Sequence, residues 1–170
     1  MKQIKITIGG ISKEELICLL KEKNILINPL GEKLLESDLF QVTKERQPID
    51  LTEISLIELG LTDGNAGLLK VIKQAENVGL KICSPDVAPF LRLAYFEDTN
   101  SHGTEKKHKT PDGAVTVVSE ILDEDLYFPK GFYLRKIDND YWLRGYICDY
   151  EHTFDPNEKF IFTGTYNENL

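Results

Sequence analysis

The sequence predicts an α+β fold in which an antiparallel sheet of about five short strands packs against one main helix, beside a small helical N-terminal unit. The helical patterns lie mostly in the first half of the chain, whereas five short strand patterns follow residue 90. Residues 131–148, GFYLRKIDNDYWLRGYIC, have two alternating aromatic-rich runs around the turn Asp138-Asn139-Asp140, which indicates a β-hairpin. With 170 residues, 41% of them apolar, the chain can bury a core of its own.

The N-terminal part, residues 1–48, predicts a small β-α-α unit. Residues 3–8, QIKITI, alternate polar and apolar side chains and end at two glycines, as a strand does. Ser12 and Glu15 then have the spacing of a capping box, in which the two side chains bond each other's backbone amides. We therefore expect a helix that begins at Ser12 and ends near Lys23.

A second short helix is predicted over residues 29–35. Asn28 is a favoured N-cap, and Pro29 is tolerated in the first turn because amides there have no intrahelical acceptor. The polar residues that follow end at Pro48, where we place the boundary of the N-terminal unit. The remaining residues, 49–170, are predicted to form an α+β domain.

The main helix is predicted over residues 65–78, with Thr62 or Asp63 as its cap. Gly79 can adopt the left-handed conformation that ends many helices. Apolar residues recur at helical spacing, so one face should be buried against the sheet. The expected buried residues are Leu68, Leu69, Ile72 and Ala75.

The strands are predicted from the alternation of polar and apolar residues and, in one segment, from a proline that should interrupt a helix. Residues 49–56 alternate loosely and predict a strand, with a helix as the alternative. Ser84-Pro85-Asp86 has the pattern of a helix start, but Pro89 would interrupt its hydrogen bonds, so we expect one turn followed by a strand over 90–96. The other strands are predicted at 114–122, in the hairpin and at 159–166.

The hairpin also carries the candidate binding residues. Because side chains alternate between the faces of a strand, Leu134 and Leu143 share the face opposite to a group of aromatic and arginine residues. That combination is typical of interface hot spots. The alternative is that the rings pack beneath the N-terminal unit, or cover the sheet with cation-π contacts. The candidate binding residues are Tyr133, Arg135, Trp142, Arg144 and Tyr146.

Two further features would fit an enzyme. Cys83 lies just before a possible helix N-terminus, where the helix dipole would favour a thiolate nucleophile, although free cysteines are more often buried and inert. Carboxylates cluster within residues 120–125, and paired carboxylates can perform acid-base catalysis, although a hydrated acidic loop is the more ordinary explanation. The cluster comprises Glu120, Asp123, Glu124 and Asp125.

Charge and composition disfavour several other functions. The formal charge of -8 repels nucleic acid, and no stretch is apolar enough to span a membrane. Three cysteines without a C-x-x-C motif, and a start unlike a signal peptide, indicate the reducing cytoplasm. His102 and His108 do not have the spacing of a zinc site, and common nucleotide motifs are missing. We therefore expect no metal and no cofactor.

The string from Leu59 to Phe162 resembles a group of uncharacterised bacterial proteins. The shared features are an ELGL segment, GLKICSP, VAPFLRLAY, a VVSEIL-type strand, DYWL in a hairpin and a final KFIF. The group has no established activity, so the resemblance implies a fold and transfers no catalytic residue. Where such relatives have a short turn, this chain has the longer segment 97–113, which is expected to be particular to this protein.

These observations predict a soluble, non-catalytic binding or protein-interaction module that uses the surface around Trp142. The identity of its protein or small-molecule partner does not follow from the sequence. The alternative is a small cytoplasmic enzyme, such as a hydrolase, that uses Cys83 or the carboxylates of residues 120–125.

Overall fold

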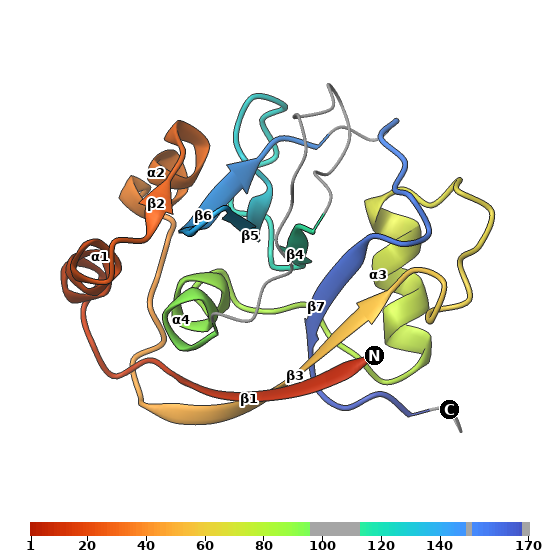
Figure 1. The fold of residues 1–170 in the computed structure, drawn as a ribbon, viewed down its shortest axis with the longest axis horizontal. Coiled ribbons are helices and arrows are strands. Elements are labelled where there is room, and N and C mark those ends of the chain that lie inside the picture. The colour runs from red at the N-terminus through yellow and green to blue at the C-terminus, as the bar shows by residue number, and fades with distance from the viewer. Residues whose placement is uncertain (96–112, 149–150, 168–170) are drawn as a thin grey trace.

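The computed structural model has one seven-stranded mixed sheet with helices on both faces (Figure 1). It describes residues 1–95, 113–148 and 151–167. The sheet order is β1-β3-β7-β4-β5-β6-β2. The strands are β1 (Lys2–Ile8), β2 (Leu26–Ile27), β3 (Gln47–Ser55), β4 (Val115–Val117), β5 (Gly131–Ile137), β6 (Asp140–Tyr146) and β7 (Lys159–Thr163). The helices are α1 (Lys13–Glu22), α2 (Pro29–Glu36), α3 (Leu68–Asn77) and α4 (Val87–Ala94).

The predicted fold class was wrong in three respects. The described sheet has seven strands rather than about five, four helices pack on it rather than one main helix, and the sheet is not purely antiparallel. Strands β4 and β7 are parallel neighbours, as are β2 and β6. The proposed boundary at Pro48 falls inside β3, and β1 and β2 form the two edges of the same sheet. Residues 1–48 therefore contribute strands to the common sheet.

Local capping signals in the N-terminal part were confirmed. The Ser12 hydroxyl accepts a hydrogen bond from the Glu15 amide, and the Glu15 carboxylate accepts one from the Ser12 amide, which completes the capping box of α1. The Asn28 side chain accepts a hydrogen bond from the Gly31 amide at the start of α2. Such caps depend on residues three positions apart, so they can be read directly from the sequence.

Residues 87–94 form helix α4 instead of the predicted strand over 90–96. Pro89 is the third residue of α4, and the first four amides of a helix have no intrahelical acceptor. The proline therefore costs α4 no hydrogen bond. Most of α4 is buried, with Leu91 and Arg92 fully inaccessible.

The two faces of the sheet have separate cores. On the first face, α1, α2 and α4 enclose apolar residues that include Phe132, Leu134 and Leu143. On the second face, α3 covers Phe160 and Phe162 of β7. Figure 1 shows α3 on one side of β7 and α4 on the other.

The buried face of α3 differs from the prediction. Val71 and Ala75 are buried, and Leu68 and Ile72 are half-buried against the second core. Leu69, expected in the core, is 65% exposed. The helix begins at Leu68, three residues later than predicted, and its rotation about its axis carries Leu69 outward.

Candidate functional site

The structure brings the five candidate binding residues to one face of the hairpin. Tyr133 lies directly opposite Arg144, and Arg135 opposite Trp142, so each pair shares a face. This is the second face, because Tyr133 aligns with Thr116, which in turn aligns with Phe160 under α3. The alternation of side chains was therefore sufficient to group the residues.

Exposure divides the same residues into two sets. Tyr133 and Arg135 are buried, at 9% and 2% exposed, whereas Trp142, Arg144 and Tyr146 are half-buried. The Arg144 guanidinium lies 5.2 Å from the Trp142 ring centre and 5.9 Å from that of Tyr133. Burial raises the pKa of the Tyr146 hydroxyl above its usual value. The partly accessible residues of the predicted surface are thus Trp142, Arg144 and Tyr146, and the Arg144 guanidinium lies near both the Trp142 ring and the buried Tyr133 ring.

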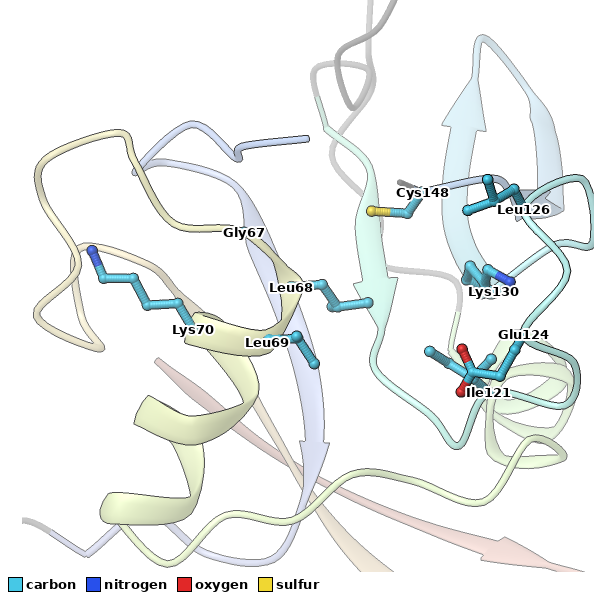
Figure 2. A pocket seen from close by; sticks show the side chains of 9 residues that line it. All are labelled: Gly67, Leu68, Leu69, Lys70, Ile121, Glu124, Leu126, Lys130 and Cys148. Atoms are coloured by element: carbon cyan, nitrogen blue, oxygen red, sulfur yellow. The ribbon is translucent and has the colours of Figure 1, made fainter. Parts of the chain in front are cut away.

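A pocket of about 140 Å³ opens between the start of α3 and the loop that leads into β5. In Figure 2, Leu68 and Leu69 extend from α3 toward this pocket, and the sulfur of Cys148 is directed toward the α3 side. Cys148 lies two residues after Tyr146, just beyond the end of β6. The lining residues are Gly67, Leu68, Leu69, Lys70, Ile121, Glu124, Leu126, Lys130 and Cys148.

The walls of the pocket are unusually apolar for an accessible surface. Leu69 is 65% exposed, Leu126 is 54% exposed and Ile121 is 36% exposed. Single exposed apolar residues are common, but a contiguous group around a concavity marks a binding surface. None of these three side chains is in the sheet, which explains why strand alternation did not reveal them.

Lys130 fixes the shape of the opposite wall. Its side chain is almost fully buried, and its ammonium donates hydrogen bonds to the carbonyl oxygens of Asp123 and Asp125, both at 2.7 Å. The Asp123 carboxylate accepts a bond from the Asp125 amide, and the Asp125 carboxylate accepts one from the Tyr127 amide. The acidic segment 120–125 is therefore an internally bonded turn. Across the described ranges, no group of acidic, histidine or cysteine residues could hold a metal ion.

Cys83 does not have the environment of a nucleophile. It is buried in the core and lies before the Asp86 N-cap, where its backbone bridges to Ser119 instead of opening a helix. Burial raises the pKa of its thiol to about 12, against a weaker opposing effect of the hydrogen bond that the Thr163 hydroxyl donates to the sulfur at 3.3 Å. The thiol is therefore protonated at neutral pH, whereas catalysis needs the thiolate.

This burial predicts a pH dependence of stability. Above pH 9.0, the ordinary pKa of the thiol, the unfolded chain loses its Cys83 proton while the native chain keeps it up to about 12. Because the native state then binds more protons, stability should fall with rising pH by about 1.4 kcal/mol per pH unit in this window. Denaturant unfolding at about pH 8 and about pH 10.5 would measure the change. We expect the loss to be about 2 kcal/mol smaller in Cys83→Ala; equal losses would contradict the assigned burial.

A second, wider depression of about 520 Å³ lies near the N-terminus. Its charged groups largely pair with one another. Lys159 Nζ lies 3.1 Å from Glu53 Oε1, and the Met1 ammonium contacts the Glu58 carboxylate. Paired charges leave less capacity for a ligand, so the apolar pocket is the stronger candidate.

Comparison with known proteins gave no match among family models, curated proteins or solved structures. The resemblance to uncharacterised bacterial proteins therefore stays a prediction. The segment 97–113 that was expected to be particular to this chain lies outside the described residues, apart from Gly113. None of the helices in the described ranges is long and apolar enough to cross a membrane.

Proposed function

We propose that this protein is a non-catalytic binding module whose binding surface lies on the second face of the hairpin, around Trp142 and Arg144. The supporting observation is that these two side chains are half-buried rather than enclosed, with the Arg144 guanidinium 5.2 Å from the Trp142 ring centre, on the strand that leads to Cys148 at the apolar pocket. Tryptophan and arginine dominate binding energies because each combines a large contact area with a polar group.

The buried residues beneath this surface support the proposal. Tyr133 lies next to Arg144 and is itself 9% exposed, so the arginine rests on a fixed ring. A rigid surface loses little conformational entropy when a partner binds. The raised thiol pKa of Cys83 also makes the hydrolase alternative weaker than the binding one.

The proposal extends to compartment and partner class. Three free cysteines are compatible with the reducing cytoplasm. The net charge of -8 favours a protein or small-molecule partner over nucleic acid.

The proposal can be tested with a double variant, Trp142→Ala/Arg144→Ala, in the tagged full chain. Partner capture from an extract of the source organism, followed by mass spectrometry, should recover at least roughly tenfold less of any specific partner. Trp142→Phe with Arg144→Lys retains aromatic and cationic character and should keep part of the recovery. Thermal unfolding would establish that both variants are folded.

A matched control is available on the loop between α2 and β3. Leu39→Ala/Arg46→Ala removes an exposed apolar residue and an arginine far from β6 in sequence, and it should leave capture unchanged. Equal partner recovery by the wild type and a folded Trp142→Ala/Arg144→Ala variant would refute the proposed surface. Severe unfolding of that variant and of the conservative variant would assign the rings to the core instead.

A further inference from the structure

We draw no further inference here: the strongest candidate, the apolar pocket of about 140 Å³ between the start of α3 and the 121–130 loop, has charges of both signs in its lining, and nothing in the described residues shows what covers it.

Discussion

Replacing Phe160 by alanine should lower the free energy of unfolding by about 3 to 5 kcal/mol. Phe160 is fully buried on the interior strand β7, and its ring meets that of Phe154 edge-on, with the ring centres 5.1 Å apart. The deletion removes the transfer free energy of the ring and leaves a cavity beneath α3. Urea unfolding followed by circular dichroism would measure the change.

Leu69→Ala provides a control on the same side of the sheet. Leu69 belongs to α3 but is 65% exposed, so its truncation should change stability by no more than about 0.5 kcal/mol. A large loss in Leu69→Ala would return this residue to the core, where the helical pattern predicts it, and would remove a wall of the pocket. A small loss in Phe160→Ala would contradict the packing of α3 on β7.

The predictable parts of the fold depend on residues close together in sequence. The Ser12 capping box, the Asn28 cap and the hairpin of β5 and β6 follow from patterns a few residues long. Sheet order is different, because β4 pairs with β5 on one edge and with the distant β7 on the other. Strand patterns show that a segment is extended, but they do not identify the strands that pair with it. This is why the sequence predicts an antiparallel sheet where the structure has a mixed one.

The error at α4 has another cause. A proline such as Pro89 predicts a helix break, but its position relative to the helix start decides whether it breaks anything. Because α4 begins at Val87, the proline occupies the first turn. The apolar run around Leu91 is buried on nearly all sides, so it lacks the periodicity that separates a helix from a strand.

For the candidate site, the sequence predicted which residues share a face of the hairpin, but not how exposed each of them is. Alternation placed Tyr133, Arg135, Trp142, Arg144 and Tyr146 on one face, as the strand register does. Their burial depends on what packs above them, which no local pattern records. The pocket joins α3, the 121–130 loop and Cys148, three separate segments, so its only sequence signal was the apolar Leu126-Tyr127-Phe128 run after an acidic turn.

Replacing Gly145 by alanine should destabilise the protein by about 3 kcal/mol or more, because α2 packs directly on the backbone of β6. A Cβ atom at Gly145 would lie 2.5 Å from both the Gly31 nitrogen and the Leu30 carbonyl carbon. Backbone atoms cannot rotate away as a side chain can, so the helix must move. The Asn28 side chain links both elements: its amide donates to the Gly145 oxygen, and its oxygen accepts from the Gly145 and Gly31 amides.

Gly60→Ala separates this clash from backbone strain. Gly60 has a φ of 81°, but a Cβ atom there would meet nothing within 4 Å, so alanine should cost only about 1 to 2 kcal/mol of left-handed strain. Denaturant unfolding should show that Gly145→Ala is much less stable than Gly60→Ala. In Gly145→Ala, the rate of amide hydrogen exchange should increase most in α2 and β2. Both elements depend on β6 for their position, since β2 pairs only with that strand in the described sheet. If the two variants were equally stable, the close approach of α2 to β6 would not exist, and the edge of the sheet beside Trp142 would have to be held in another way.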